Sequence, residues 1–134
     1  MAAGVLDTST LILLERLDPA DLPSEPVITA ITLAELSVGP LVTTDDRERA
    51  ARQARLQEVE SAFEPWPFDS VAARAFGGVV ASLRRSGRKP SARAFDALIA
   101  ATAIANGLPL YTCNPRDYVG IEDLELIELT HPDG

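Results

Sequence analysis

Short apolar runs alternate along this chain with longer stretches that repeat at helical spacing. The runs at 2–6, 27–29 and 108–112 have the length and composition of buried strands, and the segment at 124–129 alternates apolar and charged residues like an edge strand. Helical patterns cover roughly 8–18, 32–38, 44–63, 71–87 and 92–106. Strands alternating with helices predict an α/β fold, a three-layer α/β/α sandwich around a mainly parallel sheet.

Capping and turn residues set the expected ends of several helices. Thr8 or Ser9 is a natural N-cap for the first helix, which would leave Asp7 without a capping role. Gly39-Pro40 predicts the end of the helix at 32–38. Gly77-Gly78, inside the helix after Asp69, indicates close packing against a neighbour.

One carboxylate falls on a helical face that is otherwise apolar. With a helical period, Asp96 shares its face with Ala92, Ile99, Ala100 and Ala103. A buried, unpaired carboxylate costs on the order of several kcal/mol, so such groups are normally paired, protonated or metal-bound. Asp96 is therefore a candidate functional residue, and a surface acid on a misjudged helical face is the alternative.

Three further acids are candidates for the same site. Asp7 directly follows the first strand and Asp117 follows the strand at 108–112, so both belong at the carboxyl edge of a parallel sheet, where such folds bind ligands. Glu35 stands three residues after Thr32. Each has a simpler role available: an N-cap for Asp7, a capping box for Glu35 and a surface ion pair with Arg116 for Asp117.

Composition indicates one globular domain spanning residues 1–134, with 46% hydrophobic and 24% charged residues. No apolar run has the roughly 18 residues needed to span a bilayer, and the N-terminus does not resemble a signal peptide. The single cysteine, Cys113, cannot form an intrachain disulfide, which suits a reducing compartment. We therefore expect a cytoplasmic protein that does not enter a membrane.

The formal net charge of −8 argues against nucleic acid covering the whole surface, but the cations are clustered. Five of the twelve Lys and Arg residues fall just before the helix that carries Asp96: Arg84, Arg85, Arg88, Lys89 and Arg93. This strip could position a phosphate backbone without reading its sequence. Its alternative is a solvated helix end, where cations are favourable.

The acids point to hard-metal chemistry. His131 is the only histidine, and Cys113 lies beside a strand like a small core residue, so a histidine triad or zinc site is disfavoured. The chain has no glycine-rich phosphate loop. Carboxylates without nitrogen or sulfur partners favour Mg²⁺ or Mn²⁺. We expect metal-assisted hydrolysis of a phosphodiester.

Four motifs in this order resemble the PIN-domain ribonucleases, specifically the VapC toxins of bacterial toxin–antitoxin pairs. They are LDTS, TLAEL, AFDALIAATA and YTCNPRDY, and the resemblance covers about 5–129. It implies a Mg²⁺-dependent endoribonuclease whose acidic quartet is Asp7, Glu35, Asp96 and Asp117. It also implies that the first three of these hold the metal.

The same resemblance implies further partners and residues. Thr8 and Asn114 match polar positions that could hold ligands or waters beside the acids. A homodimer and a small antitoxin are implied, with contacts expected on the helix at 44–63 and the helix after Asp69. Pro115 stiffens the loop before Asp117 and could displace that carboxylate.

Two other functions stay open. A phosphoaspartyl phosphatase would use Asp7 as nucleophile, but it needs a second acid two positions on, where Ser9 stands. A catalytically inactive PIN-like domain would bind RNA or protein without cleaving it. The complete quartet disfavours this module but does not demonstrate turnover.

Overall fold

The computed structural model of the protein describes residues 2–134, without the side chains of Ser91 and Ala92. Its strands are β1 (Ala3–Leu6), β2 (Glu25–Val27), β3 (Leu110–Thr112) and β4 (Leu126–Glu128). Its α-helices are α1 (Thr8–Ile12), α2 (Ala30–Val42), α3 (Asp46–Ala62), α4 (Ser70–Arg85) and α5 (Ala94–Ala105). Short 3-10 helices cover Leu14–Arg16, Pro19–Asp21, Pro90–Arg93 and Pro115–Tyr118.

The strands within residues 2–134 form one parallel sheet in the order β2-β1-β3-β4. The chain moves from β1 outward to β2, then returns to place β3 on the other side of β1. The strand order therefore reverses between β1 and β3, and ligands of open α/β sheets bind at the carboxyl ends of strands at such a point. Asp7 directly follows β1 there, and Cys113 and Asn114 follow β3.

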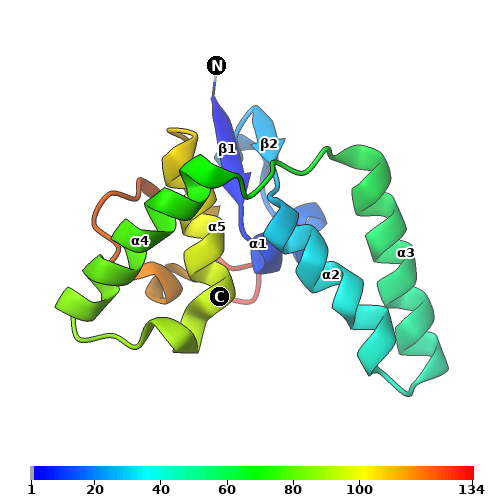
Figure 1. The fold of residues 1–134 in the computed structure, drawn as a ribbon. Coiled ribbons are helices and arrows are strands. Elements are labelled where there is room, and N and C mark those ends of the chain that lie inside the picture. Colours follow the sequence, from blue (N-terminus) through cyan, green and yellow to red (C-terminus); the bar gives the residue numbers. More distant parts are fainter. Residues whose placement is uncertain (1) are drawn as a thin grey trace.

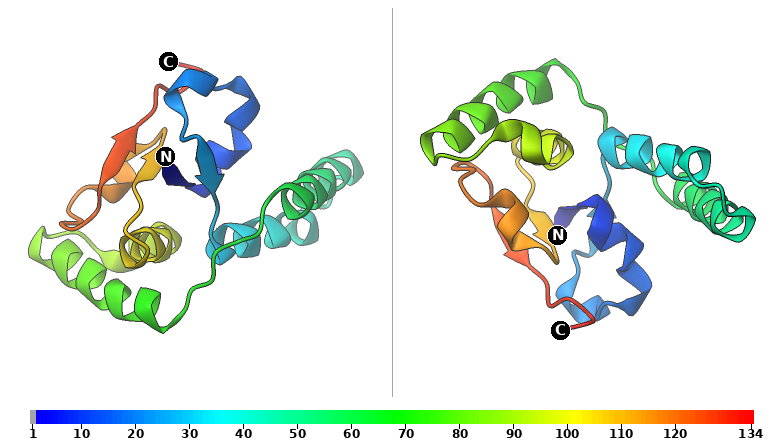
Figure 2. Two further views of the ribbon diagram at one scale, coloured as in Figure 1. Left: turned by 90° about the horizontal axis from the view of Figure 1, so that it is seen from above. Right: turned by 90° about the horizontal axis from the view of Figure 1, so that it is seen from below.

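Helices cover both faces of the sheet, which confirms the predicted α/β architecture (Figures 1 and 2). Val5 belongs to the core on the side of α4 and α5, together with Leu83 and Ile99. The next residue of β1, Leu6, belongs to the opposite core, with Leu11 of α1. This alternation follows from the two-residue period of a strand.

The helices α2 and α3 form a hairpin that projects to one side of the sheet (Figure 1). The prediction that Gly39-Pro40 ends the helix is wrong, because α2 continues to Val42. Pro40 is buried, and Gly39 lies against α3, where an added Cβ would come 3.2 Å from Cδ of Arg52. Packing of α3 on α2 therefore outweighs the local cost of a proline within a helix.

Two smaller features also differ from expectation. The strand β2 begins at Glu25 and includes Pro26, which a sheet tolerates because β2 is an edge strand. The prediction of close packing at Gly77-Gly78 is wrong, since a Cβ built at either glycine meets no atom within 4 Å. This side of α4 is open. Within residues 2–134, no helix combines the length and apolarity that a membrane span requires.

Candidate active site

The carboxylate of Asp7 is buried at the reversal point of the sheet, with 2% of the residue exposed. Its Oδ1 accepts from the backbone N–H of Thr10 at 3.0 Å, and its Oδ2 accepts from the hydroxyls of Thr112 at 2.7 Å and Tyr118 at 2.9 Å. Asp7 is thus itself the N-cap of α1, so the prediction of Thr8 or Ser9 as the cap is wrong. Capping occupies one oxygen and leaves the other facing the site.

Glu35 faces the same edge of the sheet from the first half of α2. Its Oε1 accepts from the hydroxyl of Thr8 at 2.6 Å, and that hydroxyl also lies 2.9 Å from the hydroxyl of Thr32. The alternative capping box is wrong, because the N-cap of α2 is Thr29. Hydrogen bonding to Thr8 instead ties Glu35 to the residue next to Asp7.

Asp96 lies in the first turn of α5, half-buried above an apolar face. Ile99, Ala100 and Ala103 are fully buried, as predicted, whereas the side chain of Ala92 lies outside the described residues. The hydroxyl of Tyr118 is 3.4 Å from Oδ1 of Asp96 and 2.9 Å from Oδ2 of Asp7. One phenol therefore bridges the two acids.

The other three acids act electrostatically on Asp96. The pKa of Asp96 is raised to about 6, chiefly by burial and then by the charges of Asp117, Asp7 and Glu35, while the hydrogen bond from Tyr118 acts in the opposite direction. Burial and the charges of Asp7, Asp96 and Asp117 raise the pKa of the Tyr118 phenol far above its usual range. Tyr118 therefore keeps its proton and acts in this site as a hydrogen-bond donor.

Asp117 lies in the 3-10 helix that Pro115 begins, so the proline starts the turn that carries this acid. Its Oδ1 lies 3.2 Å from the guanidinium of Arg93, and its charge is the largest electrostatic contribution to the raised pKa of Asp96. Asn114 precedes this turn and donates from Nδ2 to the hydroxyl of Ser9 at 2.9 Å. The last motif thus brings Asp117 and Asn114 to the same edge as Asp7.

The predicted basic strip divides into two groups. Arg88, Lys89 and Arg93 line a pocket of about 270 Å³ together with Asp117. Arg85 is instead paired with Glu122 at 3.0 Å on the surface. Arg84 is exposed in the last turn of α4. Cations beside the acids therefore come from the second half of the strip.

The donor set fits a hard divalent cation, since every candidate ligand is an oxygen. Repulsion among carboxylates, expressed in the raised pKa of Asp96, is what such an ion would relieve. Among residues 2–134, however, no three His, Cys, Asp or Glu side chains lie close enough together to hold a metal. The acids are therefore arranged around Tyr118 rather than gathered into a finished metal-binding cluster.

Sequence reasoning did not identify Thr112 and Tyr118, which hold Asp7 in place. Thr112 is the last residue of β3 and Tyr118 directly follows Asp117, so both are next to positions that the strand pattern had marked. Their positions, at the end of a strand and directly after a candidate acid, were the signal that could have identified them. Cys113, by contrast, lies in the core with a pKa that burial raises, as predicted for a structural thiol.

Comparison with known proteins agrees with this geometry. The profile of the PIN domain matches residues 5–119. Ribonuclease VapC5 of Mycobacterium tuberculosis is 38% identical over 131 residues, covering 96% of this chain and 94% of the relative. Ribonuclease VapC4 of the same organism is 33% identical over 129 residues, covering 94% and 96%. The chain therefore belongs to the PIN-domain family, as a ribonuclease of the VapC type.

Solved structures give the same result. VapBC-5 of Mycobacterium tuberculosis, a member of the VapBC family of toxin–antitoxin systems, has a TM-score of 0.83 at 38% identity, covering 96% of this chain and all (100%) of that chain. DNA-bound VapBC from Salmonella typhimurium has a TM-score of 0.73 at 27% identity, covering 96% and 98%. VapC ribonucleases are metal-dependent in general, which accords with the all-oxygen donor set.

The raised pKa of Asp96 predicts a pH-dependent stability of the metal-free protein. The ordinary pKa of 3.8 applies to the unfolded chain and about 6 to the folded one, so the folded state binds this proton more tightly. Stability contributed by protonated Asp96 is therefore lost as the pH rises from about 4 to about 6. In EDTA, the free energy of unfolding of Asp96→Asn minus that of the wild type should rise across this window, measured by urea denaturation. A difference that does not change with pH would contradict the assignment.

The bridging phenol predicts a measurable loss in Tyr118→Phe. Removing the phenol that donates to buried Asp7 should lower the free energy of unfolding by about 1–3 kcal/mol, because the desolvation of that carboxylate is then less compensated. Tyr111→Phe is the control, since Tyr111 is also a buried tyrosine, at 8% exposure against 2% for Tyr118, and its hydroxyl has no hydrogen-bond partner within residues 2–134. Equal stability losses in both variants would show that the bridge contributes nothing specific.

Proposed function

We propose that this chain, as one nuclease domain spanning 1–134, is the toxin of a toxin–antitoxin pair and hydrolyses RNA phosphodiester bonds with the help of Mg²⁺. The observation that carries the proposal is the position of Asp7 and Asp96 on either side of one phenol, at the reversal point of the sheet. Glu35 and Asp117 complete the catalytic acids, and the charges of both act on Asp96. The relatives' ribonuclease activity supports the same chemistry.

Asp7, Asp96 and Glu35 would hold Mg²⁺, with Mn²⁺ as a substitute, because their oxygens suit hard cations. Such an ion would supply Lewis-acid chemistry for the phosphodiester and would lower the pKa of a water molecule. Thr112 and Tyr118 orient Asp7, and Thr8 orients Glu35.

Asp117 and its neighbours would act on the other side of the phosphate. Asp117 would accept a hydrogen bond from the attacking water, while Arg93 keeps its charge from repelling the substrate. Arg88 and Lys89 line the same pocket and would bind the RNA backbone without reading its bases. Asn114 and Thr8 stand beside the acids as further polar contacts.

A second candidate is the binding module without catalysis. It is favoured by one observation, that the acids within residues 2–134 are not gathered into a three-ligand cluster. Calorimetric titration with Mg²⁺, paired with a cleavage assay, separates the two functions. Metal binding without cleavage of any RNA would support the module over the nuclease.

The partner of such a toxin would be a small antitoxin protein. VapBC-5, which this chain resembles at 38% identity, belongs to a family of toxin–antitoxin systems, and this supports the proposal. The proposal includes a cytoplasmic location, because the RNA substrates of a toxin are in the cytoplasm. It also includes a homodimer, which the resemblance to VapC toxins implies.

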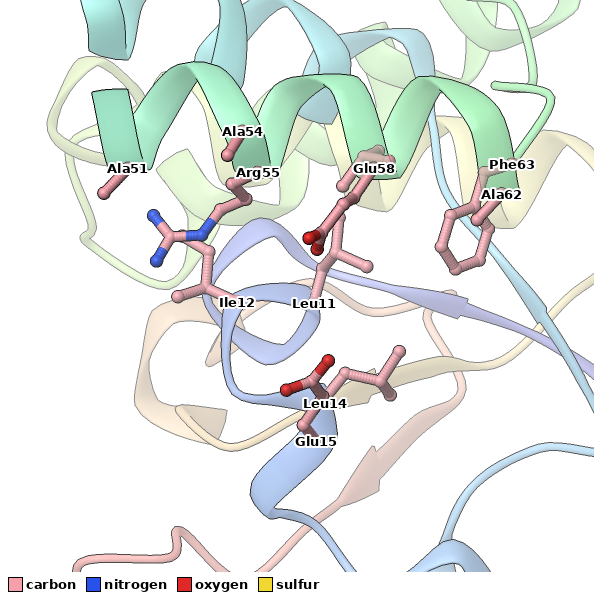
Figure 3. Close-up of a pocket in the computed structure, with 11 residues that line it drawn as sticks. Leu11, Ile12, Leu14, Glu15, Ala51, Ala54, Arg55, Glu58, Ala62 and Phe63 are labelled. Carbon is pink, nitrogen blue, oxygen red and sulfur yellow. The ribbon is translucent and has the colours of Figure 1, made fainter. Parts of the chain in front are cut away.

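A groove of about 350 Å³ between α1 and α3 is a suitable surface for the antitoxin. Figure 3 shows its walls: Leu11 and Leu14 on one side, and Ala54 and Phe63 on the other. The carboxylates of Glu15 and Glu58 lie beside these apolar side chains and line the same groove. The groove would take an antitoxin segment that presents apolar residues with a Lys or Arg among them, since that pattern complements both features. It lies along the exposed helix that the sequence had indicated for this contact.

The nuclease proposal predicts that Asp96→Asn abolishes Mg²⁺-dependent RNA cleavage, because the variant loses one metal-binding charge. The rate should fall at least about 100-fold, whereas thermal unfolding should show a folded protein. Cleavage should be followed by gel analysis of labelled RNA. Asp69→Asn is the control, since Asp69 is a helix cap outside the site. Undiminished cleavage by purified Asp96→Asn would refute the proposal.

The groove predicts a selective defect in Ala54→Phe. The new ring fills the space between α3 and α1, so the affinity for the cognate antitoxin should fall at least about tenfold, or ~1.4 kcal/mol. RNA cleavage by the free protein should stay unchanged. Gln57→Phe adds the same ring to α3 outside the groove and should bind normally. Titration calorimetry measures both, and equal affinities would place the antitoxin elsewhere.

A further inference from the structure

Cationic side chains stand beside the acids on two sides, and the second side lies on α3. Arg88, Lys89 and Arg93 line the pocket next to Asp117. A separate pocket of about 360 Å³ is lined by Thr8 and Glu35 on one wall and by Arg52 and Arg55 on the other. Glu35, which accepts from Thr8, is the member of the acidic quartet that lines this second pocket.

Arg52 is held in place on the inner face of α3. Its Nε donates to Glu48 at 3.0 Å and its Nη1 to the carbonyl of Gly39 at 2.9 Å. The stem packs against Gly39, as the close approach at that glycine shows. A guanidinium carries five N–H groups, so these two bonds leave others available to a ligand. Glu48 also lines this pocket, so Arg52 alone does not make it cationic.

Arg55 supplies the uncompensated charge. It lies one helical turn after Arg52, is exposed, and within residues 2–134 its side chain has neither an ion pair nor a hydrogen bond. In Figure 3 its guanidinium extends from α3 toward Ile12 of α1. A long, flexible cation in this position can reach a ligand that lies over Thr8 and Glu35.

The need for such cations follows from charge. An RNA backbone approaching four carboxylates on a chain of net charge −8 is repelled unless positive groups stand beside its path. On the Asp117 side that role falls to Arg88, Lys89 and Arg93. Arg52 and Arg55 occupy the corresponding place on the Glu35 side, where the sequence strip supplies no cation.

We propose that Arg52 and Arg55 bind a backbone phosphate of the RNA on the Glu35 side of the scissile bond. The inference rests on the proposed nuclease function and adds to it the route of the substrate: the strand crosses the acids from the Arg88 pocket to the α2–α3 hairpin. Arginine suits this task because its planar fork can donate two hydrogen bonds to one phosphate. These are positioning residues, since they act on the backbone and not on the reacting bond.

The test compares Arg55→Gln with Arg47→Gln. Both variants remove one positive charge from an exposed position of α3, but Arg47 lines neither pocket. Binding of a fluorescein-labelled single-stranded RNA of mixed sequence should be followed by anisotropy in EDTA at several salt concentrations. We expect Arg55→Gln to raise Kd at least about fivefold and to reduce the salt slope by about 0.7, the value for one lost phosphate contact. With Mg²⁺, its KM should rise while kcat stays near the wild-type value.

The outcomes distinguish this inference from the function on which it rests. If the wild type cleaves RNA and both variants bind it equally, the Arg52–Arg55 site is wrong and the nuclease stands. A defect of Arg55→Gln confined to antitoxin binding would also overturn it, since Arg55 borders the groove of Figure 3 as well. Wild-type protein that neither binds nor cleaves RNA would overturn both proposals.

Discussion

The carboxylate of Asp7 is the feature on which the rest of this structure depends. An ionised group with 2% exposure is tolerable only if donors replace its lost water. Those donors come from three separate elements: Thr10 of α1, Thr112 of β3 and Tyr118 of the 3-10 helix after it. Satisfying one charge therefore fixes α1 against the carboxyl ends of β1 and β3, and the same hydroxyl of Tyr118 brings in Asp96 from α5.

The second constraint is the unfavourable environment of the charged form of Asp96. Its pKa is raised to about 6, because burial and the charges of Asp117, Asp7 and Glu35 disfavour the charged form more than the hydrogen bond from Tyr118 favours it. Cations lie close to these acids. Arg93 is paired with Asp117, and Arg52 of α3 donates to the carbonyl of Gly39 on α2, beside Glu35. A chain that is acidic overall can therefore present cations where a phosphate backbone must approach, while the remaining acidic surface disfavours unspecific contact.

Much of this arrangement could be predicted from the sequence, because strand ends and helical periodicity are local signals. The apolar face around Asp96 and the strand before Asp7 indicated where the acids would lie. The cap of α1 is a local bond from Thr10 to Asp7, and the sequence offered it as an alternative. The continuation of α2 through Pro40 and the bridge by Tyr118 could not be predicted in this way, because both depend on residues distant in sequence: Arg52 for Gly39, and Tyr118 for Asp7. Helix propensity ranks the local alternatives but contains no information about partners that are distant in sequence.

The hydrogen bonds of Asp7 also have a consequence for synthesis. Thr112 and Tyr118 lie 105 and 111 residues after their partner, so a nascent chain cannot form this network until both have emerged from the ribosome. Before that moment Asp7 and Glu35 exist without the groups that orient Asp7 or bring Asp96 to it. The hydrogen bonds that hold Asp7 are therefore complete only after nearly the whole chain has been synthesised.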